Sequence, residues 1–143
     1  MLAPVLLLMA IAAGAYLIME ERSNGSASTI SANSGAFQVI DGDTVRFRGE
    51  RLRLLVIDAP EIGSPRCPAE YRAGVAAKNE LSDFIFGRLV TVHYSGRRDV
   101  FGRPLVRLSV DGNDLGKHLL SRSLAVRYAW GKRISKIYWC GLG

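Results

Sequence analysis

The sequence predicts an α+β protein: one small β-barrel domain with two helices, preceded by an apolar N-terminal helix and a linker. Short segments in which apolar and polar residues alternate recur between turn signals, as they do in strands. Two other segments place apolar residues at helical spacing. An uncharged run opens the 143-residue chain, and the remaining length has room for one domain.

Residues 1–19 contain no charged side chain. At ~1.5 Å per residue, a helix of this length can cross a hydrocarbon layer ~30 Å thick. The run fits either a retained membrane anchor or a secretory signal peptide. We favour the anchor, because a signal peptide usually begins with basic residues and because the apolar run continues past the small residues at 13–15. Both interpretations export the domain: it is either membrane-anchored outside the cytoplasm (periplasmic or extracellular) or secreted.

Residues 20–35 predict a flexible linker, because the stretch is rich in Ser, Gly and Asn and shows no apolar periodicity over 23–35. The folded domain is then expected over residues 36–143. The chain carries a net charge of +6, and residues 1–22 contribute −1, so the remainder carries +7. A basic surplus favours polyanionic partners such as nucleic acid or an anionic membrane.

The domain is expected to contain five strands and two helices, with the first helix inserted after the third strand. Pro65 and Pro68 precede the first helical run, and Gly87 follows its end. An Asn or Asp cap opens the second helix. The strands are expected at 36–40, 44–47, 51–57, 88–94 and 103–110, and the helices at 69–87 and 113–125.

The segment "DGDTVRF" at 41–47 begins a predicted hairpin. If Gly49-Glu50 forms a two-residue type II′ loop, facing residues have numbers that sum to 99. A shift of one residue would mix arginines with apolar residues on both faces, so the pattern supports this pairing. The face that is mostly apolar then carries Asp43, Val45, Phe47, Leu52, Leu54, Val56 and Asp58.

This pairing makes Asp43 and Asp58 diagonal neighbours, with Cα atoms ~7–8 Å apart. Two like charges on an apolar face repel, so we expect a cation between them, either an arginine or a hard metal ion with oxygen ligands. The plainer alternative is that Asp43 ends a turn and Asp58 caps the bend before Pro60. An EF-hand is excluded, because the segment lacks the third acidic position, the central glycine and the final glutamate of that loop.

Two segments carry a family resemblance. "VIDGDTVRFRGERLRLLVIDAPE" at 39–61 and "DVFGRPLVRLSVDGNDLGKHLLSRSLA" at 99–125 closely resemble the staphylococcal nuclease (thermonuclease) family. With the helix between them, the similarity covers roughly residues 37–130. The resemblance implies a five-stranded OB-type barrel and calcium-dependent hydrolysis of phosphodiester bonds in DNA and RNA with low sequence specificity.

The resemblance also implies the calcium ligands. By position they are the carboxylates of Asp43 and Asp58 and the backbone carbonyl of Ala59, a position that is often threonine in the family. Asp41 resembles an acid that lies close to the ion without binding it. The expected cofactor is therefore Ca²⁺.

Three further residues match the catalytic groups of the family. Arg53 and Arg103 resemble the two arginines that engage the scissile phosphate, and Glu61 resembles the glutamate that activates the attacking water. Guanidinium groups suit charge that builds on phosphate oxygens, and a carboxylate can act as a general base. By strand alternation Arg53 lies opposite the aspartates, so this role requires a bend between 53 and 58.

The nucleotide pocket departs from the family pattern. Phe101 and Ala129 stand where the best-known member has tyrosines, and Tyr128 is a candidate substitute. Cys67 and Cys140 are expected to form a disulfide in an exported chain; a two-cysteine metal site is disfavoured, since both histidines lie far from them in sequence.

The expected function is an exported calcium-dependent nuclease that acts as a monomer on DNA or RNA, with the membrane as a second partner through residues 1–19. The alternative is an inactive OB-type module that only binds nucleic acid. It is disfavoured because the acids and arginines of the family are all present.

Overall fold

The computed structural model describes residues 27–128 and 138–141. Its main sheet has the strand order β1-β6-β7-β4-β3-β2, with β8 on β7, and β5 pairs separately with β9. The strands are β1 (Thr29–Asn33), β2 (Phe37–Asp41), β3 (Thr44–Phe47), β4 (Glu50–Leu54), β5 (Ile57–Asp58), β6 (Leu89–Arg98), β7 (Pro104–Val110), β8 (Asn113–Asp114) and β9 (Val126–Arg127). The helices are α1 (Pro68–Ile85), α2 (Leu115–Ser121) and the 3₁₀ turn η1 (Ser34–Ala36).

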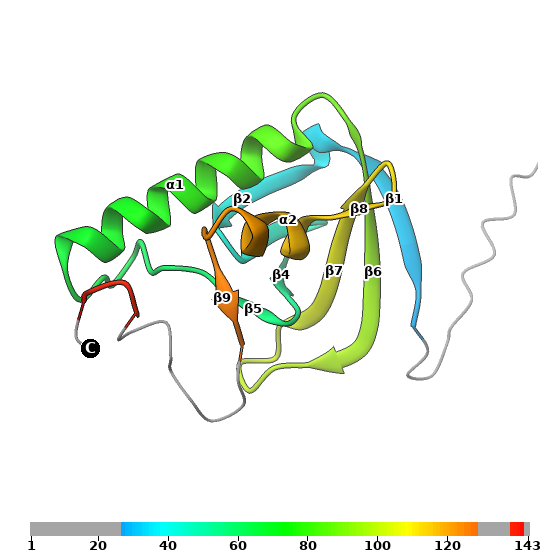
Figure 1. Ribbon diagram of the computed structural model, residues 1–143. Helices are drawn as coiled ribbons and strands as arrows, with labels where there is room; N and C mark the ends of the chain where they lie inside the picture. The colour runs from blue at the N-terminus through cyan, green and yellow to red at the C-terminus, as the bar shows by residue number, and fades with distance from the viewer. Residues whose placement is uncertain (1–26, 129–137, 142–143) are drawn as a thin grey trace, which may run out of the picture.

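The main sheet curls into a half-barrel, with α1 running across one end beside β2 and α2 lying over the centre (Figure 1). This confirms the α+β class, the OB-type arrangement and the two helices. The predicted number of strands is wrong, because β1 and the two-residue strands β5, β8 and β9 are additional. The apolar run at 1–19 lies outside the described residues, and within the described part of the chain no helix is long and apolar enough to span a bilayer.

The linker prediction is wrong for its last residues. Thr29–Asn33 form β1, which pairs antiparallel with β6 from Thr29 opposite His93 to Asn33 opposite Leu89. Ile30 and Ala32 are partly buried against the core, whereas Thr29, Ser31 and Asn33, which alternate with them, are exposed. Their alternation with polar residues is a weak strand signal that the Ser and Asn content of the stretch obscures.

The β3–β4 hairpin forms with a register two residues away from the predicted one. Facing residues have numbers that sum to 97, with Val45 opposite Leu52 and Thr44 opposite Arg53. The turn is Arg48-Gly49, and both residues have positive φ (51° and 81°), as a type I′ turn requires. Because side chains alternate with period two, a shift of two residues leaves the predicted faces unchanged.

The predicted strand 51–57 breaks at Leu55–Val56. Val56 has φ 61°, which is rare for a β-branched residue. The alternation of inward-pointing and outward-pointing side chains shifts by one residue at this position. Val56 is therefore exposed at 46%, although it was predicted to lie inside, and Ile57 is fully buried. This break is the bend between Arg53 and Asp58 that Arg53 needs in order to reach the aspartates.

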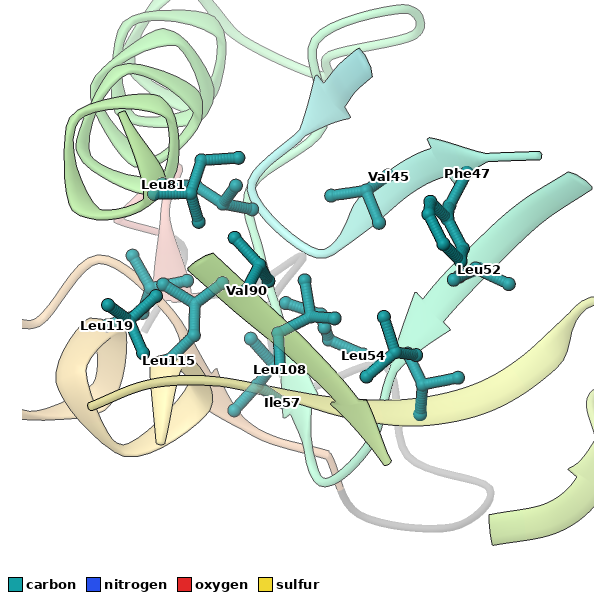
Figure 2. Close-up of a cluster of buried hydrophobic side chains, with 14 of the residues drawn as sticks. Val45, Phe47, Leu52, Leu54, Ile57, Leu81, Val90, Leu108, Leu115 and Leu119 are labelled. Carbon is teal, nitrogen blue, oxygen red and sulfur yellow. The ribbon is translucent and has the colours of Figure 1, made fainter. Parts of the chain in front are cut away.

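The core lies between the curled sheet and the two helices. Leu81 of α1 and Leu115 and Leu119 of α2 point into the same cluster as Ile57 and Leu108 (Figure 2). Asp114 caps α2 by accepting a hydrogen bond from Lys117 N–H at 2.9 Å. The buried side of α1 also includes an acid and a glycine. Its buried residues are Glu70, Gly74, Ala77, Leu81 and Ile85.

Candidate active site

A tight turn between β2 and β3 carries the first acidic segment, residues 41–43. Asp41 Oδ1 accepts a hydrogen bond from Asp43 N–H at 3.1 Å, which closes the turn around Gly42. A Cβ atom at Gly42 would lie 2.7 Å from the Cβ of Ala77 and 2.8 Å from that of Ala59. Only glycine lets this turn lie so close to α1 and to the second acidic segment.

Asp43 is buried, with 7% of its surface exposed, and both of its oxygens are engaged. Oδ2 accepts from Ala59 N–H at 2.7 Å, and Oδ1 accepts from the Thr44 hydroxyl at 3.1 Å. Burial raises the pKa of Asp43 to about 7, and the charge of Asp41 adds to this, although Arg53 opposes it. The buried carboxyl group is therefore harder to ionise than a free aspartate, even beside Arg53.

Arg53 lies between the two aspartates. Its Nη1 is 3.0 Å from Asp43 Oδ2, and its Nη2 is 3.2 Å from Asp58 Oδ1. Nη1 also donates to the carbonyl of Leu54 at 3.1 Å. Of the two cations expected between the carboxylates, the structure shows the arginine. This placement follows from the break at Val56, which turns Asp58 back toward the Arg53 side chain.

The second acidic segment, residues 57–61, ends at Glu61, and the Glu61 side chain lines the cleft. Partial desolvation raises its pKa, and the charges of Asp41, Asp58 and Glu70 raise it further, against the opposing charge of Arg53. A raised pKa brings a carboxylate closer to neutral pH, where a general base works best.

Arg103 also lines the cleft and lies in the turn just before β7, the strand that pairs with β4. Asp99 orients it by accepting from its Nε at 2.7 Å and from its backbone N–H at 2.9 Å. Desolvation opposes ionisation of Asp99, but the hydrogen bonds and charge of Arg103 outweigh it and hold the pKa of Asp99 below its usual value. Arg103 Nη1 also donates to the Thr44 hydroxyl at 3.4 Å, and Thr44 in turn donates to Asp43.

Sequence reasoning missed Asp99 and Thr44, which join the two sides of the site. Asp99 stands four residues before Arg103, and an acid at the start of a "DVFGR" turn is the signal that could have identified it. Thr44 gave no comparable signal, because a threonine in a strand is ordinary.

One cleft of about 840 Å³ is lined by all six side chains that the sequence predicted for the site. Ala59 is the exception: it is buried beneath the cleft, and its N–H binds Asp43. Within the described residues, no group of three or more His, Cys, Asp or Glu side chains is close enough to hold a metal ion by itself. The six lining side chains are Asp41, Asp43, Arg53, Asp58, Glu61 and Arg103.

Two aromatic residues flank the same cleft. The guanidinium carbon of Arg53 lies 6.0 Å from the centre of the Tyr128 ring, and that of Arg103 lies 5.6 Å from the centre of the Phe101 ring. Tyr128 N–H donates to the Val56 carbonyl at 2.9 Å, next to the β5–β9 pairing. Ala129, the other pocket position noted in the sequence, lies outside the described residues.

Cys67 and Cys140 form a disulfide with an S–S distance of 2.04 Å. The bond joins the residue just before α1 to the C-terminal segment, 73 residues further along the chain. It therefore lies at the end of the loop that carries Glu61.

Comparisons with known proteins agree with the fold. The profile of the family described as "Staphylococcal nuclease homologue" matches residues 51–138, more than half of the chain. The chain belongs to this family. The matched region begins after Asp41 and Asp43. The evidence that these two residues belong to the site is therefore the structure, since the profile does not cover them.

Two curated proteins are similar to the chain. Succinoglycan biosynthesis protein ExoI of Rhizobium meliloti (strain 1021) is 33% identical over 96 residues, which cover 64% of this chain and 50% of that protein. Endonuclease YncB of Bacillus subtilis (strain 168) is 32% identical over 93 residues, covering 62% and 44% respectively. The chain thus spans about half the length of these relatives.

Proposed function

We propose that the chain is a calcium-dependent nuclease that hydrolyses phosphodiester bonds in DNA, RNA or both, with low sequence specificity. The observation that carries the proposal is the convergence of two arginines, a glutamate and two aspartates on one cleft of a staphylococcal nuclease homologue. The name of the relative YncB, an endonuclease, supports the same activity.

Calcium suits the donor groups at this site. Asp43, Asp58 and the carbonyl of Ala59 would hold it, and carboxylate and carbonyl oxygens are the ligands that this hard cation prefers. The pKa of Asp43 is raised to about 7 even with Arg53 at 3.0 Å, so the acidic group can accept further positive charge. When bound, the ion would supply charge stabilisation at the phosphate oxygens.

The side chains of the protein bind the phosphate and take up the proton of the attacking water. Arg53 and Arg103 both line the cleft, from neighbouring strands, so a phosphodiester bound there can receive hydrogen bonds from both guanidinium groups. These bonds strengthen as negative charge grows on the phosphate oxygens in the transition state. Glu61 takes the proton of the attacking water, and its raised pKa suits that task near neutral pH.

Low sequence specificity follows from what these groups can recognise. Arginine contacts to phosphate oxygens position a nucleic acid but carry no sequence information. The net charge of +6 adds general attraction for a polyanion.

We also propose that the domain acts outside the cytoplasm as a monomer, either anchored by residues 1–19 or secreted. The disulfide between Cys67 and Cys140 supports this location, because disulfides persist in oxidising compartments. The length and apolar character of residues 1–19 support a membrane role for that segment.

The test is digestion of DNA and of RNA by the full chain, with calcium and with EGTA in place of calcium. The proposal predicts cleavage with calcium, loss of cleavage in EGTA, and a loss on the order of 10²–10³ in kcat for Glu61→Gln. Binding of nucleic acid without any cleavage would instead support the inactive binding module.

A further inference from the structure

Helix α1 packs against both acidic segments. Gly42 is packed against both Ala77 of α1 and Ala59, since a Cβ atom at Gly42 would lie 2.7 Å from the Cβ of Ala77 and 2.8 Å from that of Ala59. One turn earlier, a Cβ atom at Gly74 would lie 2.9 Å from the carbonyl oxygen of Pro60 and 3.1 Å from that of Glu61. The backbone that carries Glu61 therefore rests on the helix at Gly74.

Glu70 lies one further turn toward the start of α1 and is only 1% exposed. Its Oε2 accepts a hydrogen bond from Arg66 N–H at 2.7 Å, and its Oε1 accepts a longer one from Glu61 N–H at 3.5 Å. Both oxygens of a buried carboxylate are thus directed at backbone groups of the loop 59–67. The catalytic scheme above gives this residue no task.

A glutamate in this position of a helix usually serves the helix itself. Cys67 is the N-cap of α1, and its Sγ accepts from Glu70 N–H at 3.4 Å, which is one half of a capping box. In the other half, the glutamate would return to the N–H of the N-cap residue. Here the carboxylate reaches past the cap instead, to Arg66 and to Glu61, nine residues earlier.

We propose that Glu70 is a positioning residue that fixes the backbone of Glu61, and through it the direction of the Glu61 carboxylate in the cleft. The inference rests on the nuclease function proposed above. The loop 59–67 has no regular secondary structure, so it is held by attachments at particular points. Glu70 binds the loop at two of these points, the backbone of the loop packs against Gly74, and the disulfide of Cys67 fixes the end of the loop.

A double-mutant cycle separates positioning from a general contribution to folding. Glu70→Gln keeps the size of the side chain but leaves one oxygen to accept hydrogen bonds instead of two. We expect the kcat of DNA cleavage to fall about tenfold or more, since small misplacements of catalytic groups carry costs up to about 10²-fold. KM should stay within about twofold, because Glu70 lies below the loop and does not touch the substrate.

In a Glu61→Gln background, Glu70→Gln should lower kcat by less than about twofold, since the group that it positions has already been removed. Asp83→Asn is the matched control, because Asp83 is an exposed acid on the same helix. An unchanged kcat in Glu70→Gln, or the same loss in both backgrounds, would overturn the inference. If Glu70→Gln does not fold, Gly74→Ala replaces it in the cycle, since the added methyl group would displace Pro60 and Glu61.

Hydrogen exchange provides a measurement that does not depend on activity. In Glu70→Gln the amides of Glu61 and Arg66, which donate to Glu70, should exchange at least about tenfold faster than in the wild type, while those of β6 and β7 keep their rates. Equal exchange in the loop would overturn the inference even for an inactive chain. A wild type that exchanges as expected but does not cleave DNA with calcium would overturn the proposed function and leave the loop contact intact.

Discussion

The two sides of the cleft differ in burial and in support. On one side, Asp43 is 7% exposed and the loop that follows Asp58 rests on α1, so this acidic side is packed against the core. On the other side, the turn after β6 exposes Val100 at 92% and Phe101 at 81%. Under the proposed function, this difference predicts that the buried groups perform the chemistry and that the exposed groups contact the nucleic acid.

Two residues connect these sides. Thr44 receives a hydrogen bond from Arg103 and donates one to Asp43, and Asp99 fixes Arg103 at the base of the exposed turn. We therefore expect changes on the acidic side to reduce kcat, changes at the tip of the exposed turn to affect KM, and changes at the connection to have intermediate effects.

The largest effect is expected for Arg53→Lys. A lysine ammonium keeps the charge, but it lacks the planar fork that bridges Asp43 and Asp58 and still faces the cleft. The kcat for DNA cleavage should fall on the order of 10²–10³-fold. Arg46→Lys is the control, because Arg46 is exposed on the neighbouring strand β3. Equal kcat values for the two variants would contradict the role assigned to Arg53.

The stability of the calcium-free protein should depend on pH through Asp43. The pKa of Asp43 is raised from 3.8 to about 7, so the folded state keeps a proton that the unfolded state releases. Its contribution to stability is complete below about pH 4 and is lost as the pH rises through about 7.

Urea unfolding in EGTA measures this effect. Between pH 5 and pH 8, we expect wild-type stability to fall on the order of 2–3 kcal/mol more than that of Asp43→Asn, whose amide does not titrate. Parallel pH dependence in the two proteins would show that burial does not hold the proton on Asp43.

Asp99→Asn tests the connection between the two sides. The amide lacks the charge that orients the Arg103 guanidinium, but the turn can still form around its oxygen. We expect kcat to fall about tenfold, with KM changing by less than threefold. Asp111→Asn, in the exposed turn after β7, should leave both constants unchanged.

The smallest effect is expected at the tip of the exposed turn. Phe101→Ala removes a ring that can stack on a base, so KM for single-stranded DNA should rise about fivefold to tenfold while kcat stays within about twofold. Val100→Ala, at the neighbouring and still more exposed position, should change neither constant. A fall in kcat for Phe101→Ala would show that the ring mainly supports Arg103, 5.6 Å away.

Much of the site was predictable from the sequence because alternation fixes which residues share a face. The pattern of β3 and β4 correctly placed Val45, Phe47, Leu52 and Leu54 inside, even with the register wrong by two residues. The segments "DGD" and "IDAPE" supplied the acids, and the family resemblance supplied their roles. The structure places these side chains in one cleft.

Other features were not predictable, for physical reasons. Positive φ at Val56 opposes the preference of a β-branched residue, so no local pattern indicates the break that brings Arg53 to Asp58. Strand β1 is too polar to stand out. Glu70 did leave a signal, because an acid shares a helix face with Gly74, Ala77 and Leu81, but its target lies nine residues away in the sequence.

We have proposed that the two acidic segments form one calcium-dependent site. Its most direct test is the calcium dependence of DNA cleavage by wild type and by Asp58→Asn. We predict that Asp58→Asn needs at least about tenfold more calcium for half-maximal rate, because one charged oxygen ligand is lost from the second segment. The same calcium midpoint in both proteins, or wild-type cleavage that persists in EGTA, would contradict the account.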